Sequence, residues 1–561
     1  MKYSYQLNAL LLSLFILLSV NTFAQTKYQN VAAFTKVWGF LKYHHPAVAT
    51  GKINWDSVYV NNLPAIEKAS SKVQFSELLL SVINNLNPVQ TTQPASLPDS
   101  LFTANHNLDW IDGSTLFTPA LRNKLKEIYK YRNQANNVFI KPGYDKVAFS
   151  GEKQYENMAF PNQNYRLLFL ARFWNIIYYF APYKYIIGED WDNALTRFIP
   201  QIMNAVDRLT YYKILLKMAA SLHDGHAQLT LSDNEAPINE LVFGKYTAPL
   251  YLTIIKDTVI VRKRANDSLC DEANIQKGDI ILSVNNIPIK KRMAQLKPYV
   301  SASNSAGLNE LITRVLLNST DAFQKLEIKR GRQIFTVKVQ CILASEKKWG
   351  DIQNYTANNT GYKTIGNSIA YVYAMQVWKG NMDTIKSLIK SHKAVIFDGR
   401  NYQNNGNVFY SLFDVFLPAP KIINMSTQIM PANPGYFEWK PSAKIGRVNN
   451  SVYKGEVVIL VDERAQSQGE YTAMAFQTIP NAVTIGSSTA GVDGVQTYIP
   501  MGGKLKLSYS GYGVFYPDKT QTQRKGVKID IPVNKTVESA IKDEDVVFNA
   551  ALKYLKEKGI N

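Results

Sequence analysis

The sequence predicts a multidomain α+β protein with a helical N-terminal repeat region, a central module of short strands and a C-terminal α/β domain. A helical pattern built on Trp, Pro and Trp-Asp occurs twice in the first half of the chain. Short strand-like runs separated by turn residues fill the middle. From Gly361 onward, strand-like and helical patterns alternate, as they do in α/β domains. A chain of 561 residues is also too long for a single hydrophobic core.

The first residues have the pattern of a secretory signal peptide. Lys2 precedes an apolar run at 9–20, and the small residues before Gln25 fit a cleavage site. This run is too short for a comfortable membrane-spanning helix. We therefore expect cleavage near Ala24-Gln25 and an extracytoplasmic mature chain, periplasmic or secreted, without an integral membrane span.

The overall composition is that of an ordinary globular protein, with 46% hydrophobic residues and a formal charge of +19 that is spread along the chain. No basic helix, zinc-ligand spacing or aromatic–basic motif accompanies this charge, so we expect no nucleic-acid partner. The two cysteines, Cys270 and Cys341, could pair in an oxidising compartment or remain free thiols.

Two segments of the N-terminal half match each other. Trp38 and Trp174 each precede a proline by eight residues, and each proline precedes a Trp-Asp pair by nine. Each copy is typical of a helix that ends at the proline and is followed by a second helix. After the signal peptide at 1–24, we predict an N-terminal helical module at 25–135 and a second helical module at 136–240.

A candidate general base lies at the end of the second copy, in the run His-Asp-Gly-His at 223–226. His223 and His226 lie where a helix turns through Gly225 into a strand-like alternation. A histidine that is held by backbone on both sides suits a general base. Two alternatives stay open: a charged histidine that caps the helix, and a metal site, for which no third ligand lies nearby in the sequence.

A candidate nucleophile lies near the C-terminal end. Residues 457–461 form an apolar, β-branched run that is typical of a strand buried on both faces. Residues 468–476 have helical spacing, and Ser467 lies in the turn between the two. Many hydrolases hold their nucleophilic serine on such a strand-to-helix turn. The alternative is that Ser467 only caps the helix, in a capping box with Glu470.

Residues 278–285, Gly-Asp-Ile-Ile-Leu-Ser-Val-Asn, fit the most recognisable motif of the PDZ family. The segment 245–343 therefore resembles a PDZ domain. Such domains bind an extended peptide by adding it as a strand to a sheet edge. The resemblance implies a peptide or unfolded protein as partner. The alternative is a PDZ-like module that only bridges its neighbours.

Five motifs follow one another along the chain, at 224–226, 398–402, 465–470, 486–491 and 526–530. In this order they resemble the C-terminal-processing/tricorn-like serine peptidases, in the secreted Bacteroidetes form of PDZ-containing tail-specific protease. The resemblance implies a crotonase/ClpP-like α/β serine peptidase catalytic domain at the C-terminal end of the chain, 350–561.

The resemblance also implies the main site residues. Ser467 corresponds to the family's nucleophile, and His226 corresponds to the general base of the tricorn-like branch. Another branch uses a lysine as base, but Val492 stands at that position here. Two further positions differ from the family pattern. Gly225 replaces the serine that often precedes the histidine, and the family's orienting glutamate falls near Gln523, which carries no charge.

The remaining candidates would stabilise the oxyanion or orient the histidine. Oxyanion donors are expected at Gln468 and in the loop that contains Tyr402 and Gln403. Asp224 and Gln523 are the candidates for the orienting residue, since an amide can also hold an imidazole tautomer.

We therefore expect an extracytoplasmic serine endopeptidase that cleaves peptides or proteins through an acyl-enzyme on Ser467, with His226 as general base. The PDZ-like module would hold the extended substrate, and no metal or other cofactor is expected. The alternative is a catalytically inactive peptide-binding relative of the same family. Gly399 and the absence of the family's orienting glutamate near Gln523 favour this alternative. The sequence leaves the oligomeric state unknown.

Overall fold

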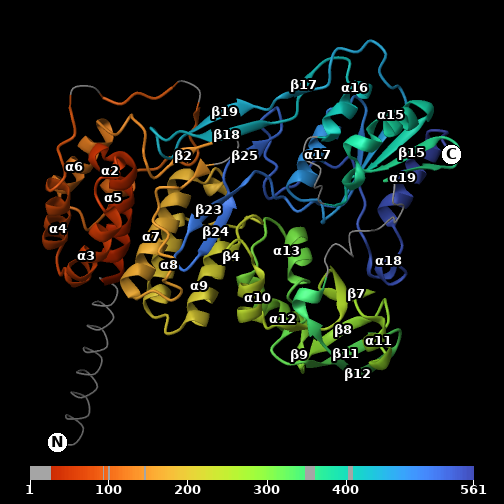
Figure 1. Ribbon diagram of the computed structural model, residues 1–561, viewed down its shortest axis with the longest axis horizontal. Coiled ribbons are helices and arrows are strands. Elements are labelled where there is room, and N and C mark those ends of the chain that lie inside the picture. Colours follow the sequence, from red (N-terminus) through yellow and green to blue (C-terminus); the bar gives the residue numbers. More distant parts are fainter. Residues whose placement is uncertain (1–26, 92–93, 99–100, 144–146, 348–360, 402–407) are drawn as a thin grey trace, which may run out of the picture. The chain divides into compact units, whose positions relative to one another are not determined.

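The computed structural model describes residues 27–91, 94–98, 101–143, 147–347, 361–401 and 408–561 (Figure 1). The predicted signal peptide and cleavage site, and the candidates Tyr402 and Gln403, lie outside these residues. The chain divides into two compact units. The first runs to Ile214 and includes 428–438 and 497–507, and the second contains 215–427, 439–496 and 508–561.

The first unit is mainly helical (Figure 1). Its helices are 27–44, α2 Pro46–Ala49, α3 Trp55–Lys68, α4 Lys72–Asn84, α5 Trp110–Gly113, α6 Pro119–Lys130, α7 Gln163–Phe180, the 3-10 turn Lys184–Ile186, and α8 Trp191–Met203. Helix α9, Arg208–Ala220, continues into the second unit. Short strands pair beside the helices: β1 Leu101–Phe102 with β19 Phe437–Pro441, and β2 Lys141–Pro142 with β3 Val147–Ala148.

The two matched segments of this unit close in the same way. The Trp38 indole N–H donates to the Trp55 carbonyl at 2.9 Å, and the Trp55 indole donates back to the Trp38 carbonyl at 3.0 Å. Trp174 and Trp191 exchange the same pair of hydrogen bonds at 2.8 and 3.1 Å. All four rings are buried, so these bonds satisfy indole N–H groups that water cannot reach. The repeated spacing therefore produces the same buried contact twice.

The second unit begins with a strand-rich part. An antiparallel sheet has the order β12-β11-β8-β7-β6, with β9 paired to β8. Its strands are β6 Leu250–Ile255, β7 Thr258–Arg264, β8 Ile280–Val284, β9 Ile287–Pro288, β11 Phe323–Arg330 and β12 Gln333–Gln340. Lys256 and Asp257 join β6 to β7 with φ of 47° and 66°, and positive φ at both positions is the mark of a type I′ hairpin.

Helices and short strands surround this sheet. The helices are α10 Ala236–Phe243, α11 Asp267–Glu272, α12 Ile289–Leu296 and α13 Ser305–Ile312, with 3-10 turns at Lys297–Tyr299 and Ala344–Glu346. A small separate sheet pairs β5 Tyr246–Thr247 with β10 Asn318–Ser319 and with β13 Ile342–Leu343. Cys270 and Cys341 are both buried and are free thiols.

A second sheet forms the centre of the C-terminal part, in the order β14-β15-β16-β21-β22-β26. Strand β14 is antiparallel to β15, and the following neighbours are parallel. The strands are β14 Tyr362–Ile365, β15 Ile369–Tyr373, β16 Ala394–Asp398, β21 Glu456–Val461, β22 Val483–Gly486 and β26 Ile531–Pro532. The mixed α/β architecture that the sequence predicts is therefore present.

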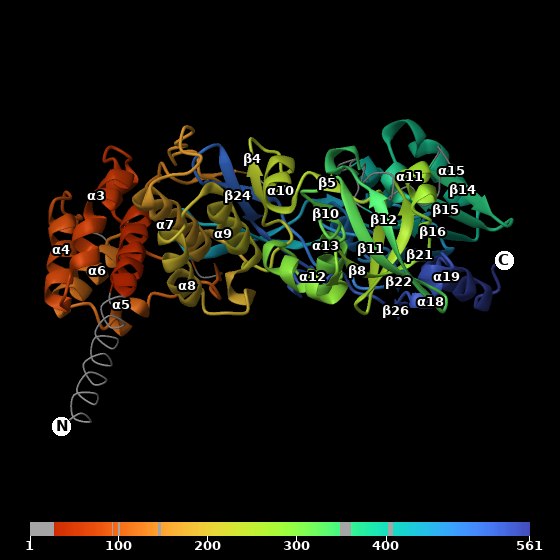
Figure 2. The same ribbon diagram turned by 90° about the horizontal axis from the view of Figure 1, so that it is seen from below.

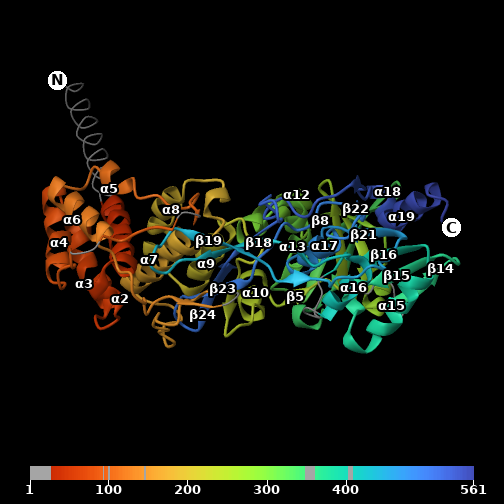
Figure 3. The same ribbon diagram turned by 90° about the horizontal axis from the view of Figure 1, so that it is seen from above.

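Helices cover both faces of this sheet. Helices α15 Met382–Ser391, α16 Phe413–Phe416 and α17 Gln468–Phe476 pack on one face, and α19 Val546–Glu557 packs on the other (Figures 2 and 3). Alternate residues of β21 serve the two cores: Val457 and Ile459 lie in the first, and Val458 and Leu460 lie in the second. Each such side chain contributes roughly 1.5–3 kcal/mol on burial, which explains the uninterrupted apolar run.

Several short elements complete the described part of the chain. They are α18 Val537–Ile541, the 3-10 turns Ala374–Gln376, Lys379–Asn381 and Val408–Leu412, and strands β4 Leu229–Leu231, β17 Lys421–Ile422, β18 Met425–Ile429, β20 Lys444–Ile445, β23 Gln496–Pro500, β24 Leu505–Ser510 and β25 Gly513–Phe515. Strand β4 pairs with β24, and the Ser508 N–H donates to the Gln228 carbonyl at 2.9 Å. Within the ranges that the structure describes, no helix has both the length and the apolar character of a membrane span.

Candidate active site

Ser467 lies at the tight turn between β21 and α17. Its backbone has φ 51° and ψ −116°, a strained conformation for a residue with a side chain. Its N–H donates to the Val492 carbonyl at 2.8 Å. The Ser467 side chain makes no capping hydrogen bond to α17. The capping alternative is therefore wrong, because the helix does not use this hydroxyl.

Glu470 accepts from the Ser467 backbone, as in a capping box, but most of its hydrogen bonds go elsewhere. One carboxylate oxygen accepts from Thr489 Oγ1 at 2.5 Å and from the Gly491 N–H at 2.8 Å, and the other accepts from the Val492 N–H at 2.7 Å. Burial raises the pKa of Glu470 to about 7, although these hydrogen bonds oppose the rise. The side chain thus ties the loop that contains Thr489, Gly491 and Val492 to α17 and holds Val492 against Ser467.

His226 follows α9 and lies just before β4, and hydrogen bonds fix both its ring and its backbone. Its Nδ1 lies 3.0 Å from Ser510 Oγ. Its N–H donates to Asp224 Oδ1 at 3.0 Å, and its carbonyl accepts from Gln496 Nε2 at 3.0 Å and from Ser508 Oγ at 2.7 Å. Burial lowers the pKa of His226, and the neighbouring Asp224 carboxylate opposes that shift.

Asp224 is buried and accepts hydrogen bonds from several directions. Its Oδ2 accepts from the Ser510 N–H at 2.6 Å, and its Oδ1 accepts from Ser510 Oγ at 2.9 Å and from Gln523 Nε2 at 3.2 Å. The amide oxygen of Gln523 accepts in turn from the Asp493 N–H at 2.9 Å. Both sequence candidates for the orienting residue therefore belong to one network with His226.

Ser510 is a residue of this network that the sequence did not indicate. It lies on β24, 284 positions from His226, and no motif surrounds it. A pairing between β24 and the segment after His226 was the only signal that could have found it.

Gly225 occupies a position without room for a side chain. A Cβ at this residue would lie 2.3 Å from Val492 Cγ2, well inside van der Waals contact. Val492 is the residue whose carbonyl accepts from the Ser467 N–H, so the two candidate segments pack on the same residue. A serine at position 225 would therefore require the Val492 side chain to shift.

Ser467 and His226 line the same cavity, of about 400 Å³. The other lining residues are Gly225, Gln228, Leu311, Arg314, Gln466, Gln468, Tyr471, Asp493, Gly494, Val495, Gln496 and Tyr512. Among the described residues, neither Ser467 Oγ nor His226 Nε2 has a hydrogen-bond partner. The structure therefore brings Ser467, His226 and Gln468 together, with a hydroxyl and an imidazole nitrogen available to a ligand.

His223 is not part of this arrangement. It is exposed, has φ 48°, and does not line the cavity. In the described ranges, no group of three or more His, Cys, Asp or Glu side chains is placed to hold a metal ion.

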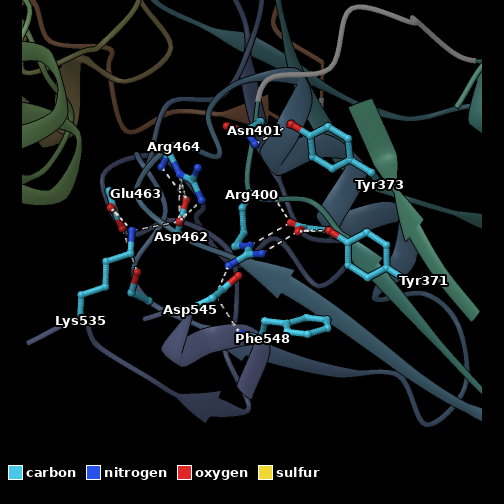
Figure 4. Close-up of polar contacts among 12 residues, drawn as sticks. Tyr371, Tyr373, Arg400, Asn401, Asp462, Glu463, Arg464, Lys535, Asp545 and Phe548 are labelled. Carbon is cyan, nitrogen blue, oxygen red and sulfur yellow. Dashed lines mark hydrogen bonds and ion pairs between the residues drawn. The ribbon is translucent and has the colours of Figure 1, made fainter. Parts of the chain in front are cut away.

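Two buried ion pairs hold the loops that follow β16 and β21 (Figure 4). Each strand ends in Asp-X-Arg, and the arginine folds back onto the aspartate two residues before it. Arg400 lies 2.7 Å from Asp398, and Arg464 lies 2.6 Å from Asp462. Burial alone would raise the pKa of Asp398, but Arg400 holds it below its usual range. Each pair thus neutralises a charge that the sheet core would otherwise leave uncompensated.

Further contacts extend these pairs toward the chain's C-terminal end (Figure 4). Arg400 also lies 2.5 Å from Asp545, and Lys535 lies 2.7 Å from Glu463. After Arg400, the Asn401 side-chain amide donates to the Tyr373 hydroxyl at 2.7 Å. The segment that leads to Ser467 and the residues from Asp398 to Asn401 are therefore both anchored by polar contacts.

Comparisons with known proteins agree with this architecture. Residues 369–533 match the model of peptidase family S41. The nisin-resistance protein of Lactococcus lactis subsp. lactis is 32% identical over 97 residues, which span 17% of this chain and 29% of that protein.

Solved structures extend the similarity of fold beyond the matched domain. Mature CPAF complexed with lactacystin has a TM-score of 0.54 and 14% identity, and the match covers 70% of this chain and 98% of that chain. Mature CPAF also has a TM-score of 0.54 with 14% identity, and covers 70% and 96%. Residues 369–533 therefore form a domain of peptidase family S41, which confirms the resemblance to the C-terminal-processing/tricorn-like serine peptidases.

Proposed function

We propose that this protein is an extracytoplasmic serine endopeptidase in which Ser467 attacks the substrate's peptide carbonyl and His226 accepts the serine proton. One observation carries the proposal: Ser467 Oγ and His226 Nε2 belong to the same cavity and have no other partner in the described part of the chain. The strained backbone of Ser467 supports the same role, because strain of this kind is retained where a residue must be held in place.

The reaction proceeds in two steps. His226 Nε2 takes the proton of Ser467 Oγ as this oxygen attacks the carbonyl carbon, and the imidazolium then protonates the leaving amine. Water, deprotonated by the same nitrogen, hydrolyses the acyl-enzyme. The lowered pKa of His226 keeps the imidazole neutral, and therefore able to accept a proton, below the usual histidine range.

The oxyanion of the tetrahedral intermediate needs hydrogen-bond donors next to Ser467. Gln468 is the first residue of α17 and lines the cavity, and its N–H has no acceptor among the described residues. The positive end of the helix dipole lies at the same place. We assign the Gln468 N–H as one donor, with the second from the loop that contains Tyr402 and Gln403.

The strand-rich part would hold the substrate in extended form, as PDZ domains do. Strand β6 ends its sheet, and α13 packs beside it. Two residues from the C-terminal part of α13 and the turn after it, Leu311 and Arg314, line the same cavity as Ser467. A peptide added along β6 would therefore be led toward the serine.

Covalent labelling tests this function. The mature chain from Gln25 is treated with a fluorophosphonate, and the labelled residue is mapped by mass spectrometry. We expect label on Ser467, no label in Ser467→Ala, and strongly reduced labelling in His226→Asn. His223→Asn is the matched control, since His223 lies in the same turn and outside the cavity. A folded wild type without label would instead favour the inactive peptide-binding relative.

A further inference from the structure

We propose that Ser510 and Asp224 are the positioning residues of His226, and that they replace the serine and glutamate that the family pattern places at 225 and 523. This inference rests on the proposed roles of Ser467 and His226. Both expected positions are unsuitable here. Gly225 has no space for a side chain, because a Cβ would lie 2.3 Å from Val492 Cγ2, and Gln523 carries no charge.

The contacts around Ser510 determine where its single proton goes. Ser510 Oγ lies 2.9 Å from Asp224 Oδ1 and 3.0 Å from His226 Nδ1. A carboxylate only accepts hydrogen bonds, so the hydroxyl proton is donated to Asp224. The oxygen of Ser510 is then left to accept, and the group beside it that can donate is the Nδ1–H of His226.

This order of donors selects one tautomer of His226. With the proton on Nδ1, the Nε2 lone pair is free to accept the proton of Ser467. Without Asp224, the Ser510 hydroxyl could donate to Nδ1 instead, which would place the proton on Nε2 and remove the base. The hydroxyl thus transmits the preference of the carboxylate to the imidazole, and the nearby negative charge stabilises the imidazolium that forms during the reaction.

Gln523 supports Asp224 because it is an amide. Its Nε2 donates to Asp224 Oδ1 at 3.2 Å and to Ser303 Oγ at 3.3 Å, and its oxygen accepts from the Asp493 N–H at 2.9 Å. A glutamate here would face the Asp224 carboxylate without a proton to donate. An amide at 523 is therefore compatible with the carboxylate at 224, because it supplies a donor where a glutamate would add a second negative charge.

Two serines of β24 allow a matched test. Ser510 and Ser508 are both buried and both contact His226, but Ser510 contacts the ring and Ser508 contacts the backbone carbonyl. We expect Ser510→Ala to slow fluorophosphonate labelling and kcat by about 10–100-fold with little change in KM. Ser510→Thr, which keeps the hydroxyl, should restore most of the rate. Ser508→Ala should cost less than Ser510→Ala.

Two further measurements separate the Asp224–Ser510–His226 hydrogen-bond chain, here called the relay, from the proposed function. Nitrogen-15 histidine spectra of the wild type should show His226 with its proton on Nδ1, and Ser510→Ala should lose this preference. Gln523→Glu, which restores the family residue, should lower the rate. An Nε2–H tautomer in the wild type, or Ser510→Ala labelled as fast as the wild type, would overturn the relay. A wild type without label on Ser467 would overturn the proposed function, and the histidine spectrum would still decide the relay.

Discussion

A buried ion cluster in the first unit and the His226 network in the second unit have similar ingredients. In the cluster, Lys42 Nζ lies 2.6 Å from Glu152, and Arg172 lies 2.8 Å from Glu152 and 3.1 Å from Asp56. The Tyr155 hydroxyl donates to Asp56 at 3.0 Å. Two cations thus meet two anions, and these charged side chains are almost inaccessible to solvent.

The His226 network ends differently. Asp224, Ser510 and Gln523 satisfy one another, but His226 Nε2 and Ser467 Oγ remain without a partner among the described residues and line a cavity. The charged groups of the ion cluster contact one another, so the cluster contributes to folding. The His226 network instead ends in a hydroxyl and an imidazole nitrogen that line a cavity, so it can act on a bound molecule. The comparison shows that a polar network indicates function when some of its groups face a cavity without a partner, whatever residue types it contains.

The largest effect is expected at the open end of the His226 network. Ser467→Ala should lower peptidase activity by about 10⁶-fold, because the nucleophile of the acyl-enzyme step is lost. The free energy of unfolding should change little, since the hydroxyl makes no hydrogen bond within the described chain. Peptide hydrolysis and urea unfolding of the same sample check both parts. If Ser467→Ala lost its activity because it unfolds, the contrast between the ion cluster and the His226 network would be contradicted.

The closed cluster should respond in the opposite way. Asp56→Asn leaves Lys42 and Arg172 with one anion, and removing one partner of a buried ion pair costs about 3–5 kcal/mol. Asp192→Asn is the matched control, because Asp192 follows the corresponding tryptophan of the second copy and pairs with Lys36 at a partly exposed site. Its cost should stay below about 1 kcal/mol. Equal losses of unfolding free energy in Asp56→Asn and Asp192→Asn, measured by urea unfolding, would contradict this difference.

Acid should also affect the two units differently. Burial lowers the pKa of His44 to about 3 and of His45 to about 4. The unfolded chain takes up these protons below about 6.5, while the folded unit does not, so its stability is present above that pH and lost as the pH falls toward 4. Unfolding at pH 7 and pH 5 measures this loss. His44→Phe should reduce the pH dependence, and an unchanged slope would count against this cause.

For the His226 network, the same kind of shift should appear in activity. The pKa of His226 is lowered, chiefly by burial, so its protonation should remove the base only below the usual histidine range. The acid limb of the kcat/KM profile should therefore lie below pH 6.5. A limb above pH 6.5, measured with the wild type where it remains folded, would show that another group controls the rate.

The smallest effect concerns the strain at the open end. Ser467 has φ 51°, which glycine adopts without a steric penalty. Ser467→Gly should therefore be more stable than Ser467→Ala by about 1 kcal/mol, although both are inactive. Equal unfolding free energies in the two variants would show that this turn stores no strain.

Local sequence was sufficient for some of these features. The strand before Ser467 and the helix after it follow from an apolar run and from helical spacing. The Trp-Pro-Trp spacing predicted two related helical segments, and the structure adds the buried contact that each of them makes. The capping box that was the alternative for Ser467 did not include Gly491 and Val492, which Glu470 also binds and which belong to a distant loop. Such contacts leave no periodic signal in a single sequence.

The orienting residues show the same limit. Asp224 was a candidate from the sequence, but Ser510 reaches the ring through the pairing of β24 with the segment after His226. That pairing depends on tertiary packing. The need for glycine at position 225 likewise depends on the tertiary contact with Val492, which the sequence alone does not indicate.

A crystal structure of the mature chain after fluorophosphonate treatment tests the central claim most directly. We predict phosphorus bonded to Ser467 Oγ, its free oxygen facing the Gln468 N–H, and His226 Nε2 within hydrogen-bond distance of the adduct while Nδ1 stays on Ser510. An adduct on another residue, or an imidazole turned away from Ser467 in a fully labelled crystal, would contradict the assignment of Ser467 and His226 to one active site.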